Sequence, residues 1–307
     1  MELNALLEQP ITLPSQPRVV ALLTSELNAA APNLRRLNQL LGSDPALAAR
    51  LLQEANSPAF AAQRKVFGIP EALALLGVAQ LRTLVSTAPV GTTSRSVPGM
   101  NLQHFWSYSL NTAKLARSFA GLVHHNQLAA YTAGLLHGLG ELALHLADPQ
   151  HMQTIDSLKA PLDIDRAKIE QRLFGYSYGQ ISAQLAERWD LPGEVVDALH
   201  YHSAPFDNDV YEPLSGILHL AAWRARAREM GLTENQLTVS FPGEVGVALG
   251  LDIDTVLQQD PFDWNSLPID NEGEDIGEDI NEDEIQSGGK GSDGNKGGGE
   301  ADTVILV

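Results

Sequence analysis

Residues 43–56 read SDPALAARLLQEAN, and this short segment contains the clearest structural signal in the chain. Asp44 can cap the free amides of a helix start, and Pro45 has the backbone angle of a first helical residue. Apolar residues then recur every four positions on one face, at Leu47, Leu51 and Ala55. The Ser-Pro pair at 57–58 ends the pattern. The segment therefore predicts a helix with one buried face.

Helical spacing extends in both directions from this segment. Upstream, Leu34, Leu37 and Leu41 form a stripe, and downstream a helix opening at 69–71 is interrupted by Gly77 and resumes beyond it. After a Gly-, Pro-, Thr- and Ser-rich linker at 89–100, helices are predicted at 102–123, 128–147, 149–159, 163–173, 177–189, 193–202 and 212–230, with two short helices within 242–259. Long alternating runs typical of strands are nearly absent, so we predict an all-α fold.

Changes in composition divide the chain into four predicted segments. These are an N-terminal helical subdomain over 1–95, a helical bundle over 96–232, short C-terminal helices over 233–262 and a tail over 263–307. The tail is acidic and Gly-rich and has few large apolar side chains. Such a segment cannot bury enough surface to offset the entropy lost on ordering, so we predict that the tail is disordered.

Charge and cysteine content narrow the functional classes. The net charge is −18 and no cysteine is present, which excludes disulfides and thiolate metal sites and is typical of a reducing compartment. Residues 1–95 carry 8 basic and 6 acidic side chains, whereas residues 96–307 carry 12 basic and 32 acidic ones. An acidic surface repels phosphate backbones and anionic lipid, so nucleic acid and membranes are disfavoured as partners. The first 15 residues hold two glutamates and no Lys or Arg, unlike a signal peptide, so we expect a cytoplasmic protein.

Several stretches over about residues 13–230 together resemble a known family. They are LPSQP at 13–17, SDPALAARLL at 43–52, ANS at 55–57, RKV at 64–66, ALALLG at 72–77, FW at 105–106, AGLLH at 133–137 and ERWDLP at 187–192. In order and spacing they resemble the HDOD family, the HD-related output domain of bacterial signalling proteins. The resemblance implies a wholly α-helical protein, with an N-terminal helical subdomain followed by an HD-like bundle.

The active relatives implied by this resemblance are HD-type phosphohydrolases, in which His and Asp residues from several helices hold divalent metal ions. Such ions activate water and stabilise phosphoryl charge. This chain departs from that pattern at most ligand positions, which correspond to Tyr108, His137, Gly138, Tyr178 and Ala222. Only His137, with His202 as a second candidate, remains as a metal ligand. We therefore expect that the metal site is lost.

A new metal site is an alternative within the predicted helix 128–147. His137, Glu141 and His145 are spaced by four residues, as chelating side chains on one helix face can be. The apolar stripe on the other side is formed by Leu135, Leu139, Leu142 and Leu146. The polar face is more typical of a hydrated or hydrogen-bonded edge than of a metal site. Gly138 and Gly140 are expected to permit close helix packing.

The sequence thus predicts a non-catalytic signal-transduction module that needs no cofactor and acts through protein–protein contacts. The family resemblance implies partners in trans, of the response-regulator, histidine-kinase or cyclic-dinucleotide-enzyme classes. The junction of the two helical parts is the expected partner site, with Trp106, Trp189 and Trp223 packing in the bundle or lining that junction.

Two other functions stay open at this point. One is a residual metal-dependent phosphohydrolase that relies on His137. The other is a DNA-binding regulator that uses the helix–Gly–helix segment 71–87, where the residues facing a groove would be Gln80, Arg82, Thr83 and Ser86. Against the second alternative, a helix that reads DNA normally carries more Lys and Arg.

Overall fold

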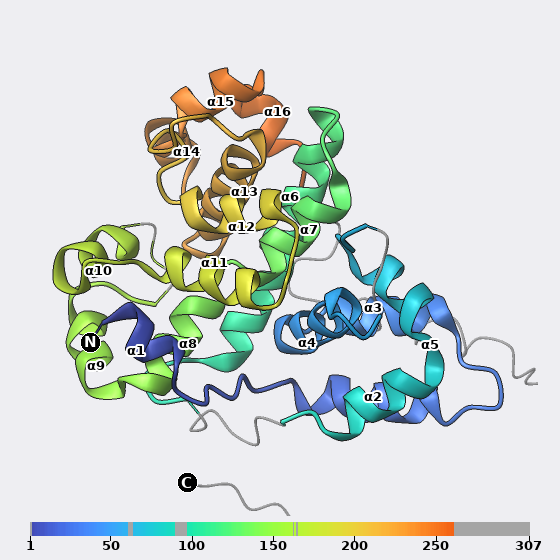
Figure 1. Cartoon of the computed structure of the whole chain (residues 1–307). Coiled ribbons are helices and arrows are strands. Elements are labelled where there is room, and N and C mark those ends of the chain that lie inside the picture. Colours follow the sequence, from blue (N-terminus) through green and yellow to red (C-terminus); the bar gives the residue numbers. More distant parts are fainter. Residues whose placement is uncertain (1, 61–63, 90–96, 162, 164, 261–307) are drawn as a thin grey trace, which may run out of the picture. The chain divides into compact units, whose positions relative to one another are not determined.

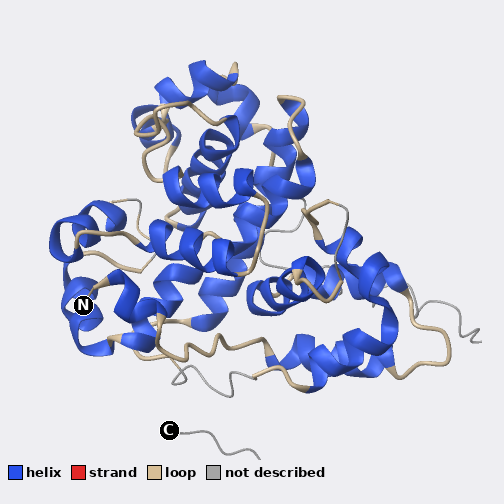
Figure 2. Cartoon of the chain, in the orientation of Figure 1, coloured by secondary structure: helices blue, strands red, loops and turns tan. Residues whose placement is uncertain are grey.

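The structure is a computed structural model that describes residues 2–60, 64–89, 97–161, 163 and 165–260. Within these residues the chain forms sixteen helices and no strand (Figures 1 and 2). The first five are α1 (Leu3–Leu7), α2 (Pro17–Leu27), α3 (Leu34–Gly42), α4 (Pro45–Asn56) and α5 (Ile69–Ser86). Then come α6 (Leu102–Leu122), α7 (Gln127–Leu136), α8 (Leu139–Ala147), α9 (Pro149–Leu158), α10 (Arg166–Phe174), α11 (Tyr178–Arg188), α12 (Gly193–Tyr201) and α13 (Pro213–Glu229). The last are α14 (Glu234–Ser240), α15 (Gly243–Leu249) and α16 (Ile253–Leu257). The predicted all-α fold is confirmed.

The start of α4 follows the predicted capping chemistry and also joins two helices. Asp44 Oδ1 accepts a hydrogen bond from the Leu47 amide at 2.9 Å, and Oδ2 accepts one from the Gln16 amide at 2.6 Å. One carboxylate therefore caps α4 and holds the residue that precedes α2. The side chain is fully buried, and this burial raises the pKa of Asp44 to about 6.

Helix α5 is kinked where the sequence predicts an interruption. Gly77 has φ 70° and ψ 171°, a backbone conformation that favours glycine. Buried residues continue on both sides of the kink, at Leu73 and Leu76 before it and at Leu81, Leu84 and Val85 after it. By length and composition alone, α5 is also the one described helix that could cross a membrane, and 39% of that stretch is buried in the fold.

The bundle is built around α6, which packs against α7 and α13, while α11 packs against α8 and α12 (Figure 1). Two glycines allow these close approaches. A Cβ at Gly134 would lie 2.6 Å from the Cα of Ala113 in α6, and a Cβ at Gly140 would lie 2.0 Å from the carbonyl oxygen of Tyr178 in α11. The expectation of close packing is confirmed for Gly140, whereas Gly138 lies at the break between α7 and α8.

The prediction of one helix over 128–147 is wrong, because α7 ends at Leu136 and α8 begins at Leu139. A side chain from α11 compensates the interruption. The Ser182 hydroxyl donates to the His137 carbonyl at 2.8 Å and accepts from the Gly140 amide, also at 2.8 Å. The apolar residues continue at helical spacing through the break, so they give no sign of it.

Other boundaries differ in smaller ways. Helix α10 begins at Arg166 and not at 163, and α14 lies in the predicted C-terminal helical segment 233–262 but before the two helices placed within 242–259. Its capping box, formed by Thr233 and Gln236, is a sequence signal that would have located it. The two short helices predicted within 242–259 are present as α15 and α16. The predicted tail 263–307 and part of the linker, residues 90–96, lie outside the described residues.

The predicted boundary at residue 95 stays a prediction, but α1 packs against α11 of the bundle. Leu6 and Leu7 are buried in a cluster with Ile181 of α11, and Arg188 of that helix donates to the Leu7 carbonyl. Between the N-terminal helices and the bundle, the Tyr131 hydroxyl donates to the Gly42 carbonyl at 2.8 Å. Of the tryptophans considered for this junction, Trp223 is buried and its indole donates to Ser240, whereas Trp106 and Trp189 are half-buried against the core.

Candidate functional site

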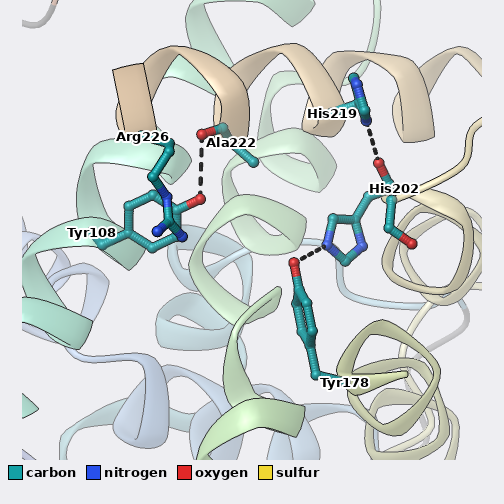
Figure 3. Close-up of a pocket in the computed structure, with 7 residues that line it drawn as sticks. Tyr108, Tyr178, His202, His219, Ala222 and Arg226 are labelled. Carbon is teal, nitrogen blue, oxygen red and sulfur yellow. Dashed lines mark hydrogen bonds between the residues drawn. The ribbon is translucent and has the colours of Figure 1, made fainter. Parts of the chain in front are cut away.

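The residues that the family resemblance places at metal-ligand positions come from four places in the bundle and partly converge. Tyr108 of α6, Tyr178 of α11 and Ala222 of α13 line one small cavity of about 20 Å³. The remaining lining residues are His202, Ser203, His219 and Arg226. Figure 3 shows Arg226 and Ala222 on the same helix above Tyr108, with His202 between Tyr178 and His219. We call this space the bundle cavity.

His137 does not line the bundle cavity but lies against two residues that do. Its ring centroid is 5.2 Å from that of Tyr108 and 5.8 Å from that of His202, both in edge-on arrangements. His137 is fully buried, and its Nε2 has no hydrogen-bond partner in the described part of the chain. Gly138 turns the backbone away and contributes no side chain. The two residues that the resemblance aligns with a His-Asp pair therefore supply one buried imidazole and no carboxylate.

Three imidazoles are oriented in the same way by backbone carbonyls. The Nδ1 atoms of His137, His202 and His219 lie 2.7, 2.8 and 2.7 Å from the carbonyl oxygens of Gly134, Leu199 and His202. Because a carbonyl oxygen only accepts, Nδ1 carries the proton in each ring and Nε2 presents a lone pair. This is the orientation that metal-binding histidines usually have.

Burial keeps these rings neutral. Desolvation, reinforced by His202 and Arg226, lowers the pKa of His137 to about 3. Desolvation also lowers the pKa of His202 to about 4 and shifts that of His219 in the same direction. The imidazoles thus contribute lone pairs and no positive charge at neutral pH.

Two tyrosines of the cavity lining make hydrogen bonds through their hydroxyls. The Tyr178 hydroxyl donates to His202 Nε2 at 3.1 Å, and the Tyr108 hydroxyl donates to the Ala222 carbonyl at 3.2 Å (Figure 3). Burial raises the pKa of both phenols, so they remain protonated donors. The Nε2 lone pair of His202 is therefore already engaged.

The charge at the bundle cavity comes from Arg226, a residue that sequence reasoning did not single out. Its guanidinium carbon lies 5.0 Å from the centroid of the Tyr108 ring, in a cation–π contact. Its Nε and Nη2 atoms are buried and have no hydrogen-bond partner among the described residues. No Asp or Glu belongs to the lining of the cavity. Glu229, which acts electrostatically on Tyr108, pairs with His104 at 3.0 Å.

These residues do not fit a divalent cation. Hard divalent ions need carboxylate or free imidazole ligands, and a fixed guanidinium beside the cavity repels a second positive charge. Here the hydroxyl of Tyr178 holds one imidazole, and the lining has no anionic ligand. The imidazoles are held by backbone carbonyls, but the cavity lining does not supply a set of ligands for a metal ion.

A second group of functional side chains lies below the bundle cavity, between α8, α9 and α10. Glu141, His145 and Asp156 bring ligand atoms within 4.8 Å of one another. Glu141 and His145 are fully buried, so this face of α8 is not hydrated. His137 does not join them, because the helix is broken at 137–138. The spacing of four residues thus unites only two of the three residues considered for a new metal site.

A guanidinium already occupies the centre of this group. Arg166 Nη2 lies 2.8 Å from Glu141 Oε1 and 2.7 Å from Asp156 Oδ1, and Arg166 Nε donates to Glu170 Oε1 at 3.1 Å. Glu170 Oε2 accepts from the Tyr178 amide at 2.7 Å, which links the group to α11. We call Glu141, His145, Asp156, Arg166 and Glu170 the ion cluster. Its arginine takes the place that a metal would need.

Sequence reasoning found Glu141 and His145 but missed their partners. The four-residue spacing of Arg166 and Glu170 is a signal that could have indicated an ion pair on α10. Arg226 stands among alternating arginines on α13, and nothing in the sequence distinguishes it from Arg224 and Arg228.

Two of the four side chains proposed to read DNA are tied to the protein. Arg82 donates to the Leu27 carbonyl through Nε at 3.0 Å and Nη2 at 2.7 Å, and Gln80 donates to Glu54 at 2.9 Å. Thr83 and Ser86 bond only to carbonyls of their own helix. This arrangement serves packing within the N-terminal helices.

Comparison with known proteins gives a consistent picture. The sequence model of the HDOD domain matches residues 13–205. An uncharacterized protein of Treponema pallidum (strain Nichols) is 28% identical over 178 residues, which are 57% of this chain and 34% of that protein, so the match spans about a third of the relative's length. The crystal structure of the MmoQ response regulator from Methylococcus capsulatus str. Bath superposes with a TM-score of 0.67 at 22% identity, over 81% of this chain and 98% of that one. A virulence factor from Campylobacter jejuni subsp. jejuni gives a TM-score of 0.59 at 18% identity, over 85% and 94% of the two chains.

Proposed function

This chain belongs to the HDOD family, and from that premise we propose that it is a signalling module that works by binding other proteins and not by turning over a substrate. The observation that carries the proposal is the chemistry of the bundle cavity. Arg226 and two tyrosine hydroxyls are present where a metal-dependent phosphohydrolase would need anionic ligands.

Metal-dependent hydrolysis requires first that a divalent ion is bound. A bound divalent ion must lower the pKa of a water molecule and stabilise charge on the phosphoryl oxygens. Without carboxylate ligands, and with a guanidinium beside the cavity, the ion is not held. The imidazoles do not replace the missing carboxylates, because the Tyr178 hydroxyl engages Nε2 of His202 and His137 does not line the cavity.

The partners in this proposal are signalling proteins that act in trans, of the response-regulator, histidine-kinase or cyclic-dinucleotide-enzyme classes. Membership of the HDOD family supports a role in signalling, and the chain shares the fold of a protein that is itself named a response regulator. The acidic surface and the lack of cysteine support an intracellular, protein-directed role rather than one at nucleic acid.

A metal and turnover assay on the full chain tests the catalytic half of the proposal. Protein purified without chelator is analysed for Mn, Fe, Zn and Mg, and is then assayed with added metal against phosphomonoesters, phosphodiesters and nucleotides. We expect less than one equivalent of any metal and no turnover above a metal-only blank. A stoichiometric metal, with turnover that is abolished in His137→Ala, would instead identify the residual phosphohydrolase.

Direct binding tests the interaction half. The purified chain is titrated with receiver domains, histidine kinases and cyclic-dinucleotide enzymes encoded in the same genome, by calorimetry at physiological salt. We expect saturable binding of at least one partner that is unchanged when metal is removed. Binding that vanishes with added chelator, or no binding to any member of the three classes, contradicts the proposal.

A further inference from the structure

We propose that the bundle cavity binds a small oxyanion, a phosphate or the terminal phosphoryl group of a phosphomonoester, through the guanidinium of Arg226. The proposal assigns a ligand to the cavity and does not depend on whether the chain binds signalling proteins. It rests on the unused donors of the arginine, on the local balance of charge and on the polar lining.

Arg226 has hydrogen-bond donors that the described part of the chain does not use. A guanidinium carries five N–H donors and cannot lose its proton in a protein. In Arg226 the Nε and Nη2 groups are buried without an acceptor in the described part of the chain. Tyr108 attracts the charge through its ring face, and a hydrogen bond from Arg226 acts on its phenol, but neither contact engages Nε or Nη2. A buried charged donor without an acceptor is costly, so the site is complementary to an incoming oxygen.

The charged groups around the bundle cavity are paired with residues other than Arg226. From α6, His104 engages the carboxylate of Glu229 at 3.0 Å. From α8 and α10, Glu141 and Glu170 act on Tyr178, but both carboxylates lie against Arg166. The imidazoles of His202 and His219 are neutral near pH 7. The positive charge of Arg226 is therefore not paired with a carboxylate among the described residues. A bound anion would supply the missing negative charge.

The bundle cavity is small and has a polar lining. The cavity of about 20 Å³ exceeds the roughly 10–15 Å³ that one water needs, so it has room for a small polar group and not for a nucleotide base. Besides Arg226, the Ser203 hydroxyl and the His219 ring belong to its lining. An oxyanion that enters by one edge can be held by two parallel N–H···O bonds, which is the geometry that arginine favours with phosphate.

The direct test follows the arginine itself. In ¹⁵N-labelled full chain, the Nε–H resonance of Arg226 is assigned by its loss in Arg226→Gln, and sodium phosphate, methyl phosphate and sodium chloride are titrated separately at matched ionic strength. We expect saturable shifts of this resonance with phosphate or methyl phosphate and none with chloride. Shifts with phosphate alone identify the free ion as the ligand, whereas tighter binding of methyl phosphate identifies a phosphomonoester.

Variants on α13 provide the controls. Arg226→Gln should weaken binding by about tenfold or more, because a charge-assisted bidentate contact is lost. Arg226→Lys, which keeps the charge but not the fork, should retain only part of the affinity. Arg228→Gln, an exposed position two residues further along α13, should bind as the wild type does. Thermal unfolding of each variant shows whether the fold is intact.

Three results would overturn the proposal. The Arg226 resonance could stay unmoved at millimolar phosphate, which would mean that the cavity holds only water. It could move equally with chloride, which would mean screening and no site. Arg226→Gln could bind as tightly as the wild type, which would place the ligand elsewhere. If Arg226→Gln does not fold, the wild-type titration and Arg226→Lys still decide the question. A stoichiometric metal would refute the non-catalytic function, and that result is independent of these titrations.

Discussion

Two arginines on either side of Tyr178 show how differently one side chain can be used inside the same bundle. Arg166 is fully buried and lies against three carboxylates of the ion cluster, Glu141, Asp156 and Glu170. Arg226 lies over an aromatic ring at the bundle cavity, with two N–H groups unused among the described residues. The guanidinium of Arg166 is paired with carboxylates of the protein itself. The Nε and Nη2 groups of Arg226 have no acceptor among the described residues. The burial of a charged side chain therefore does not show whether it stabilises the fold or can bind a ligand; its interaction partners show this.

The two regions also respond to pH with opposite sign. His202 has a folded-state pKa of about 4, below its ordinary value, so the unfolded chain takes up the proton first and acidification below pH 6.5 costs stability. Glu141 has a pKa well above its ordinary value, chiefly through burial and the nearby Glu170. The folded state holds that proton longer, so a rise in pH above about 4.5 costs stability there.

The largest effect should come from removing the satisfied arginine. Arg166→Met leaves three carboxylates around an apolar side chain and should lower the free energy of unfolding by about 3–5 kcal/mol. Denaturant titration at pH 7 measures the loss. In the matched variant, Arg226→Met, the change should be below about 1 kcal/mol, because no carboxylate loses its partner. Equal losses in the two variants would remove the distinction between the regions.

The next effect concerns the spacing of the two regions, which α8 and α11 fix. Gly140→Ala would place a Cβ 2.0 Å from the Tyr178 carbonyl oxygen, so the two backbones must separate. We expect destabilisation at the upper end of the about 1–3 kcal/mol that overpacking usually costs. Thermal and denaturant unfolding measure it. Gly193→Ala, where an added Cβ meets no atom within 4 Å, should be close to neutral. A neutral Gly140→Ala would show that the helices can move apart freely.

The pH response of the cavity side should depend on its histidines. Lowering the pH from 7 to 5 should cost about 2 kcal/mol through His202, given its pKa of about 4 in the folded state and 6.5 in the unfolded one. In His202→Gln this part of the slope should vanish, even though the variant is less stable at all pH values. Unfolding curves between pH 5 and pH 8 measure the slope.

The smallest effect should come from the carboxylate that is least well satisfied. Glu141 Oε2 has no hydrogen-bond partner within the described ranges, and Arg166 keeps Asp156 and Glu170 without it. Glu141→Gln should therefore change the stability at pH 7 by less than about 1 kcal/mol and should reduce the loss of stability above pH 4.5. A loss as large as that of Arg166→Met would show that the cluster acts as one indivisible unit.

The elements that the sequence predicted best are those with local chemical signals. Asp44 and Pro45 mark the start of α4, and Gly77 marks the kink of α5, because capping and backbone freedom depend only on neighbouring residues. The break between α7 and α8 was missed because its hydrogen-bond partner, Ser182, is 45 residues away from His137 and the apolar pattern continues without interruption.

The candidate site was predictable only in part, for the same reason. Family resemblance located Tyr108, Tyr178 and Ala222, which do meet at the bundle cavity. It did not indicate Arg226, whose contact with Tyr108 spans more than a hundred residues of sequence. The partners of Glu141 were missed likewise, since Asp156 and Arg166 reach it from separate helices. Periodicity predicts which face of a helix is buried, but not what that face meets.

The hydroxyl of Ser182 has a mechanical consequence. The Ser182 hydroxyl forms hydrogen bonds with both the carbonyl of His137 and the amide of Gly140. These bonds connect the break between α7 and α8 to α11. The same helix begins with Tyr178, which forms part of the cavity wall. The backbone at His137 and the cavity residue Tyr178 are therefore attached to the same helix, so their positions depend on that of α11.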